Sequence, residues 1–293
     1  MNSLQRVVKY CAIALAVILA IGIISAVANL VFGIVSFSSG RVVNRHHINA
    51  RNVSSRDDWE TVDFDETFTD VRSLNIDNST GEVRIKIGDT FRVEAQNVLK
   101  GFEAKVQGDG ELYVTDNESR FHFFGFNFNG INNPNSKITI YIPESFAAEE
   151  VKVNSGAGTV TIDQLNTDYL YVSAGAGNVK GSTIVADKVK IDGGVGSVNF
   201  TEVNFNDSDF DCGVGDLSIS GVMLGDNKFD CGVGSVDLDL TGNVEDYDLD
   251  IDSGVGNVRV NGEKISDNEL RNRSAANSIE VDGGVGDVRI DID

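Results

Sequence analysis

The tripeptide Gly-x-Gly recurs at a fixed spacing through the second half of the chain. Five copies read Gly-Val-Gly, and the two copies before them read Gly-Ala-Gly. The first four steps between copies are 19 residues each, and the last two are 22 and 30 residues. A constant period of this size is typical of a repeat protein, in which each repeat is a small unit that stacks on its neighbours. The first glycines of the copies are Gly156, Gly175, Gly194, Gly213, Gly232, Gly254 and Gly284.

Each repeat predicts short β-strands on both sides of the glycine corner. Alternate residues are mostly apolar, as in Val189 and Ile191 before one corner and Val198 and Phe200 after it. Alternate residues of a strand share one face. A single unit cannot bury that face, but stacked coils paired in parallel can. We therefore predict an all-β fold, a β-solenoid (single-stranded parallel β-helix) with 19-residue coils, in which the coil ending at Asp293 is the exposed last one.

A long apolar segment precedes the repeats. No charged residue occurs between Lys9 and Arg41, and this run exceeds the roughly 20 residues needed to span a bilayer. We predict a short cytoplasmic tail over 1–9 and one transmembrane helix over 10–37. The alternative is a cleaved secretory signal peptide with Ala26-Val27-Ala28 as its cleavage site, but the run stays apolar beyond that point. The expected location is the cell membrane, single-pass, with the large C-terminal domain extracytoplasmic.

Three further segments complete the predicted organisation. Residues 38–58 are polar and predict a flexible stalk, 59–150 an irregular β-rich N-terminal part of the solenoid, and 151–293 the regular repeats. The irregular part contains an aromatic insertion amid Gly and Asn. It is either a strand folded onto the core or an exposed loop that binds a partner, glycan or lipid surface. Its phenylalanines are Phe121, Phe123, Phe124, Phe126 and Phe128.

The chain is strongly acidic, with a formal net charge of −21. From Val151 onward 26 Asp and Glu face 10 Lys and Arg, a balance of −16. This sign excludes nucleic acid as an expected partner. An aspartate stands two residues before the corner in five repeats, so stacking at about 4.8 Å would form a row of like charges. The pattern shows no Lys or Arg accompanying Asp192, Asp211, Asp230, Asp252 and Asp282.

Two interpretations of this aspartate row remain open. Each carboxylate could cap the turn by accepting backbone N–H bonds. Alternatively the row could bind Ca²⁺, a hard cation that prefers clustered oxygens. Apart from Ca²⁺ on this row, no cofactor is expected.

The two cysteines of the repeats, Cys212 and Cys231, occupy the same phase of adjacent coils. They are expected to point inward at a spacing that permits a disulfide. Small size also explains them, because equivalent positions hold Ser, Ala and Gly. The sequence contains no metal-spaced His/Cys cluster, phosphate loop or nucleophile elbow, so we do not expect an enzyme.

The run Ile138-Thr139-Ile140-Tyr141-Ile142-Pro143, followed by Val151-Lys152-Val153-Asn154-Ser155-Gly156-Ala157-Gly158-Thr159-Val160, resembles the adhesin-like β-strand-repeat domain of bacterial envelope proteins. In that family a strand ending in a proline step leads into repeated Gly-x-Gly turns. The resemblance covers about Val71 to Asp293. It implies a β-solenoid, frequent membrane anchoring, and roles in adhesion or envelope stress. It implies no catalytic residue, and no functional residue is carried over.

These observations predict a membrane-anchored, exported, acidic β-solenoid that acts as a non-catalytic adhesion, binding or scaffolding module of the bacterial cell envelope. One alternative is an envelope-stress accessory protein that acts through membrane partners. Another is a Ca²⁺-stabilised cell-wall spacer. The expected partners are the membrane, through the N-terminal helix, and a cell-wall, glycan or membrane-protein partner.

Overall fold

The computed structural model describes residues 61–116, 120–123, 126–129, 135–265 and 271–293. The chain divides into two compact units, Met1–Ser55 and Arg56–Asp293, and all described residues belong to the second. The predicted tail, transmembrane helix and stalk therefore lie outside the described residues. Within the described ranges, no helix has the length and apolar character to cross a membrane.

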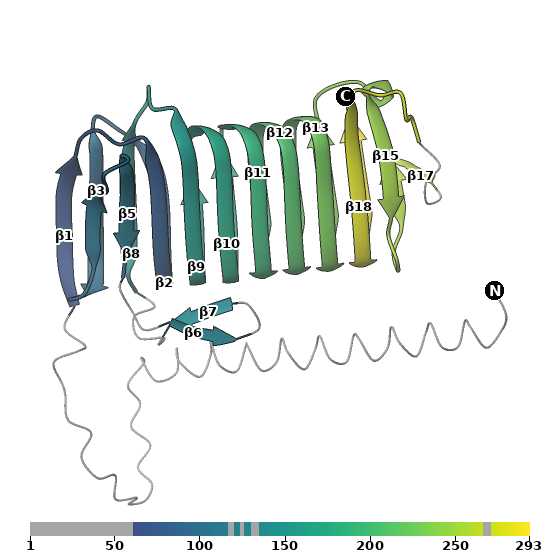
Figure 1. The fold of residues 1–293 in the computed structure, drawn as a ribbon. Helices are drawn as coiled ribbons and strands as arrows, with labels where there is room; N and C mark the ends of the chain where they lie inside the picture. The colour runs from purple at the N-terminus through teal and green to yellow at the C-terminus, as the bar shows by residue number, and fades with distance from the viewer. Residues whose placement is uncertain (1–60, 117–119, 124–125, 130–134, 266–270) are drawn as a thin grey trace, which may run out of the picture. The chain divides into compact units, whose positions relative to one another are not determined.

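The second unit is a stack of β-coils, which confirms the predicted all-β class (Figure 1). Neighbouring coils pair in parallel with an offset of one repeat. Val172 lies opposite Ile191, and Ile191 lies opposite Phe210, so the 19-residue period of the sequence is the register of the stack. The central coils are formed by β9 (Ala148–Ile162), β10 (Leu165–Ser182), β11 (Ile184–Val195), β12 (Val198–Val214) and β13 (Leu217–Val233).

The core is a thin apolar layer enclosed by each coil. Alternate side chains of the strands point inward and are buried, while those between them face solvent. In the middle of the stack the filling is aromatic. The rings of Phe210 and Phe229, one coil apart, stack with centroids 5.2 Å apart, and Phe200 meets Phe205 edge-on at 5.7 Å. Such aromatic pairs add about 0.5–1.5 kcal/mol each beyond the area they bury.

In the regular coils the second glycine of the corner is required for two reasons. Gly196 has φ +141°, a region that side chains with a Cβ rarely adopt. A Cβ built on Gly196 would also lie 1.8 Å from the carbonyl oxygen of Gly177 in the neighbouring coil, and one on Gly177 would lie 1.6 Å from that of Gly158. The coils therefore stack at this corner through backbone alone.

At the N-terminal end, the first long strand of the stack has further strands on its outer side. Strand β2 (Ser73–Gly88) pairs in parallel with β9 on one side and with β5 (Glu111–Thr115) and β8 (Lys137–Pro143) on the other. Antiparallel strands then close the stack, because β3 pairs with β8, β1 with β3, and β4 with β5. These closing strands are β1 (Thr61–Phe68), β3 (Phe91–Leu99) and β4 (Glu103–Val106).

At the C-terminal end, the expectation of an exposed last coil is wrong. Strand β18 (Asn277–Val285) lies between β13 and β15 (Tyr247–Asp252), with parallel pairing on both sides (Figure 1). In the same way β19 (Val288–Ile292) lies between β14 (Val236–Leu240) and β16 (Val258–Val260).

The irregular last two steps explain this order. The 22-residue step contains a 3₁₀ turn, Val244–Asp246. After this turn the chain does not pair with β13 but forms β15 one coil beyond it, which leaves the place beside β13 for β18. The 30-residue step contains β17 (Glu263–Ile265), which pairs antiparallel with β16 before the chain returns to β18. The outermost coil is therefore the one formed by β15 and β16, and it ends in an antiparallel hairpin like the other end of the stack.

Candidate binding surface

The structure brings the five predicted aspartates together in one row on an outer face of the stack. We call this set the acidic row. Each member lies directly opposite the next in paired strands. The row follows the coils in space and not in sequence, so Asp282 lies between Asp230 and Asp252. Its order is Asp192, Asp211, Asp230, Asp282 and Asp252.

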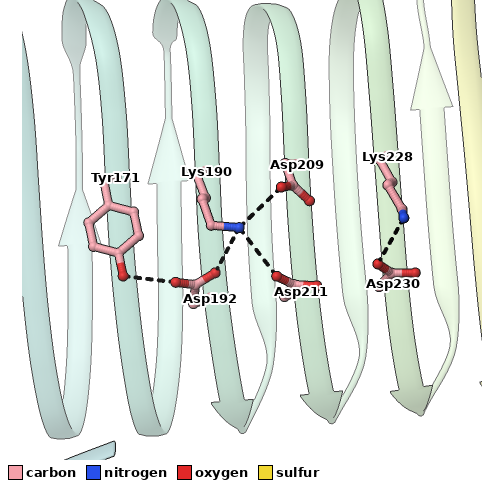
Figure 2. Close-up of polar contacts among 7 residues, drawn as sticks. All are labelled: Tyr171, Lys190, Asp192, Asp209, Asp211, Lys228 and Asp230. Atoms are coloured by element: carbon pink, nitrogen blue, oxygen red, sulfur yellow. Dashed lines mark hydrogen bonds and ion pairs between the residues drawn. The ribbon is translucent and has the colours of Figure 1, made fainter. Parts of the chain in front are cut away.

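Lys190 supplies the countercharge at one end of the acidic row (Figure 2). Its Nζ lies 3.1 Å from Asp209 Oδ2, 3.3 Å from Asp211 Oδ2 and 3.3 Å from Asp192 Oδ1. Partial burial alone would lower the pKa of Lys190, but the hydrogen bonds to Asp209 and Asp211 and the charge of Asp192 outweigh it and raise that pKa. One ammonium thus ties two adjacent coils, β11 and β12, through three carboxylates.

Lys228 repeats this arrangement further along the row. Its Nζ lies 3.3 Å from Asp230 Oδ2 and 3.8 Å from Glu280 Oε1 on the next coil in space. The hydrogen bond to Asp230 and the nearby carboxylates raise the pKa of Lys228. Both lysines therefore carry their positive charge at neutral pH.

The prediction that no Lys or Arg accompanies the row is therefore wrong. The position two residues before each aspartate points to the same face, because side chains of a strand alternate. In successive coils this position holds Lys152, Tyr171, Lys190, Asp209 and Lys228. The alternation of cation and non-cation from coil to coil was visible in the sequence. It becomes meaningful once the register shows that Lys190 reaches Asp209 and Asp211 of the neighbouring coil and Lys228 reaches Glu280 of the next coil in space.

Tyr171 is a further side chain on this face that binds a member of the acidic row. Its hydroxyl donates a hydrogen bond to Asp192 Oδ2 at 2.8 Å (Figure 2). Partial burial and this bond to a carboxylate raise the pKa of Tyr171. Asp192 is thus held from one side by a phenol and from the other by an ammonium, so its position on the face is fixed.

The first interpretation of the row is that its aspartates cap the turns. Most carboxylates that accept backbone N–H bonds at the corners belong instead to a different position of the repeat. Within the row, Asp252 Oδ1 accepts the N–H of Gly254 at 2.9 Å. The residue just after the second glycine bridges coils instead. Asp216 Oδ1 accepts the N–H of Ser235 at 2.9 Å, and Asp287 Oδ1 that of Asn257 at 2.9 Å. The hydrogen bonds that Asn257 donates to Asp287 lower the pKa of Asp287. The sequence signal of these inter-coil bonds is an Asn or Asp directly after Gly-x-Gly in four of the seven copies, and it was overlooked.

The calcium interpretation of the acidic row stays a prediction. Across the ranges that the structure describes, no three His, Cys, Asp or Glu side chains are grouped so that they could hold one metal ion. Asp192 and Asp211 share Lys190 in place of a divalent cation.

The strand segment that follows each Gly-x-Gly corner presents a second, less charged surface. Its outward residues over the central coils are mainly hydroxyl and amide side chains, with Lys180 as a cation among them. In these coils the strand segment before each corner is therefore rich in outward carboxylates, whereas the segment after it carries mainly neutral polar side chains. The residues of this second surface are Thr161, Lys180, Ser182, Asn199, Thr201, Ser218 and Ser220.

The aromatic insertion forms its own small sheet. Strands β6 (Arg120–Phe123) and β7 (Phe126–Asn129) pair antiparallel, with Phe121 opposite Phe128 and Phe123 opposite Phe126. The fifth phenylalanine, Phe124, lies outside the described residues. This hairpin is separate from the large sheet. Its strand β7 comes within 8 Å, between Cα atoms, of residues in β2, β9 and β10.

Cys212 and Cys231 lie opposite each other in β12 and β13 and are buried free thiols in this structure. The inward orientation and the pairing agree with the sequence expectation. The two sulfur atoms are not bonded to each other in this structure.

Among curated proteins, none matches this sequence. Three solved structures are similar in part. A candidate cell adhesion protein from Clostridium sporogenes is 18% identical with a TM-score of 0.42, covering 80% of this chain and 100% of its own. A candidate adhesin from Bacteroides fragilis is 14% identical with a TM-score of 0.36, covering 80% and 98%. One from Parabacteroides distasonis is 10% identical with a TM-score of 0.30, covering 81% and 98%.

The family assignment rests on a match over most of the chain. The model of the Toastrack DUF4097 family matches residues 71–293. This range includes every coil described above, from β2 to β19. The chain therefore belongs to the Toastrack DUF4097 family.

Proposed function

We propose that this protein is a membrane-anchored, exported, non-catalytic binding or scaffolding module of the bacterial cell envelope. The observation that carries the proposal is the acidic row with its bridging lysine. Lys190 holds the carboxylates of Asp192 and Asp211 in register across two coils. A surface already ordered in this way loses little conformational entropy when a partner binds, which favours recognition.

The arrangement of these groups favours positioning over chemistry. Asp192 is held by the hydroxyl group of Tyr171 and the ammonium group of Lys190 together, on the solvent-facing side of the strands. A general acid or base needs a proton that it can exchange with a bound substrate at working pH. The proposed role is therefore a rigid platform, carried by the predicted helix over residues 10–37.

The aromatic hairpin is the proposed second contact for a cell-wall, glycan or membrane-protein partner. We expect deletion of residues 121–130 to lower binding of the full chain to isolated cell-wall polysaccharide. Because β6 and β7 form a sheet of their own, the melting temperature of the solenoid should stay unchanged. A second variant with Phe121, Phe123, Phe124, Phe126 and Phe128 replaced by serine keeps the loop length. Unchanged binding by both variants would remove the hairpin from the proposal.

Membrane anchoring and export are tested by protease accessibility on intact cells, with an epitope tag after Asp293. We expect digestion of the solenoid without lysis, because the predicted topology places it outside. A cytoplasmic marker protein must stay intact in the same sample. Protection of the tag until lysis would overturn the exported module and leave a cytoplasmic scaffold.

A further inference from the structure

Two cysteines face each other inside the stack, on neighbouring coils. Cys212 of β12 lies directly opposite Cys231 of β13 in the parallel pairing. Their exposed fractions are 8% and 5%, so both thiols belong to the core. They stand immediately before the glycine corner, in an interior row of small residues. The same row holds Ser155, Ala174, Gly193, Gly283 and Ser253.

The geometry of this pair suits a covalent bond. Directly opposed residues of adjacent strands are about 4.8 Å apart, which falls in the range of about 4.4–6.8 Å between the Cα atoms of disulfides. The next positions in the row on either side are Gly193 and Gly283. These neighbours have no side chains, so within the row each thiol has only the other thiol as a side-chain neighbour.

We propose that Cys212 and Cys231 are an oxidation site, at which an inter-coil disulfide joins β12 to β13. The oxidant is a low-molecular-weight disulfide. The Cys231 thiolate attacks one sulfur of that disulfide and expels a thiolate, leaving a mixed disulfide on Cys231. The Cys212 thiol then loses its proton, attacks the Cys231 sulfur and expels the second thiolate. Two protein thiols are oxidised, and the external disulfide is reduced to two thiols.

The thiol pair itself decides which cysteine reacts first. The hydrogen bond between the two thiol groups lowers the pKa of Cys231 and raises that of Cys212, whose pKa burial raises further. Cys231 therefore has the larger thiolate fraction and is the attacking group. Because both sulfurs are buried, the reagent reaches them when the two coils separate locally, or during folding.

The bond would hold together two coils that are one repeat apart in sequence. Closing a loop of this length restricts the unfolded chain, and the loop-entropy relation predicts a rise in melting temperature of about 5–10 °C. Hydrogen exchange between β12 and β13 should slow, because these coils could no longer open independently.

The test uses the full chain in detergent with Cys11→Ser, so that only the repeat cysteines remain. The protein is unfolded and refolded in oxidised glutathione, and a parallel sample is kept in dithiothreitol. We expect a mass lower by about two hydrogens, loss of both alkylatable thiols under denaturing conditions, and the higher melting temperature. Persistence of two alkylatable thiols after refolding in oxidant would overturn the proposal.

Two sets of variants make the result specific. Cys212→Ser and Cys231→Ser should fold, since Ser155 and Ser253 occupy the same row, and should show no oxidant-dependent shift in melting temperature. The double variant Cys231→Ser with Gly283→Cys moves one thiol a coil further, where a Cβ meets its nearest atom at 3.4 Å. This variant keeps two thiols but should form no intramolecular disulfide. Equal oxidation of this variant would show that register does not control the reaction, and would also overturn the proposal.

Discussion

At the scale of single residues, the glycine corner is the position least tolerant of change. Gly196→Ala would place a methyl group 1.8 Å from the carbonyl oxygen of Gly177 and force a Cβ residue to φ +141°. We expect a loss of at least about 3 kcal/mol in the free energy of unfolding, measured by denaturant titration. Gly108→Ala is the control, because a Cβ there meets no atom within 4 Å. It should change stability by less than about 0.5 kcal/mol, and a similar loss in both variants would refute the argument.

Lys190 is the residue on which the acidic row most depends. Lys190→Met keeps the aliphatic stem but removes the ammonium that Asp192, Asp209 and Asp211 share. Since these groups are partly exposed, we expect a loss of about 1 kcal/mol in low salt. The loss should shrink as salt screens the carboxylates from one another.

The matched control for this prediction is Lys188→Met on the same strand. Lys188 is exposed, and the described residues include no ion-pair partner for it. Its removal should leave stability nearly unchanged at any salt concentration. If both variants lose the same stability with the same salt dependence, the bridge contributes nothing specific.

The lowered pKa of Asp287 leads us to expect that the free energy of unfolding decreases as the pH falls. The bonds from Asn257 hold the pKa of the Asp287 carboxyl in the folded state below the usual value for an aspartate. Its contribution to stability is therefore present above the unfolded pKa and is lost as pH falls through the lower folded pKa. Asp287→Asn keeps an acceptor oxygen without the titration. We expect the stability gap between wild type and this variant to be constant from about pH 7 to 5 and to close below about pH 4.

The pH prediction has its own control in Asp187→Asn. Asp187 is exposed, and no group among the described residues donates a hydrogen bond to its carboxylate. Its stability gap should be small throughout the titration. A gap for Asp287→Asn that stays constant down to pH 2 would contradict the assigned cause.

At the scale of elements, the C-terminal coil holds the end of the stack together. Strand β18 pairs with both β13 and β15, and β19 pairs with both β14 and β16. Deleting residues 277–293 therefore removes the only partner that the described strands provide for β15. We expect the amides of Tyr247–Asp252 to lose protection in hydrogen exchange.

The same deletion distinguishes two orders of stacking. If the coils followed the sequence, the deletion would remove an outer coil, and β15 would stay protected by β13. Protection of β9 and β10 serves as the internal reference, because these coils lie far from the deleted segment. Full protection of β15 in the shortened chain would refute the inserted order.

At the scale of the whole molecule, the net charge of −21 sets the response to ions. Like charges repel in the compact state, so the melting temperature should rise between about 10 mM and 150 mM NaCl as the Debye length shortens. The calcium prediction requires more than this screening. CaCl₂ must raise the melting temperature beyond NaCl and MgCl₂ at equal ionic strength. Equal melting temperatures in the three salts would remove Ca²⁺ from the acidic row.

The coil itself could be predicted from the sequence because its cause is local and repeated. The 19-residue period sets the register, and the apolar alternation sets which side chains enter the core. The register of Asp192, Asp211 and Asp230 and the opposition of the two cysteines follow directly from that period. Each of these predictions needs only the distance between equivalent residues and the two-residue period of a strand.

The ends of the stack and the pairing of its charges were decided by the tertiary structure. The sequence places β15 after β14, but strand pairing is indifferent to chain order, and the longer last two steps let the chain skip one coil and return. Lys190 likewise meets Asp209 and Asp211 only because a neighbouring coil brings them to its side. Contacts between residues without a fixed spacing cannot be read from a period, so they appear only when the chain has folded.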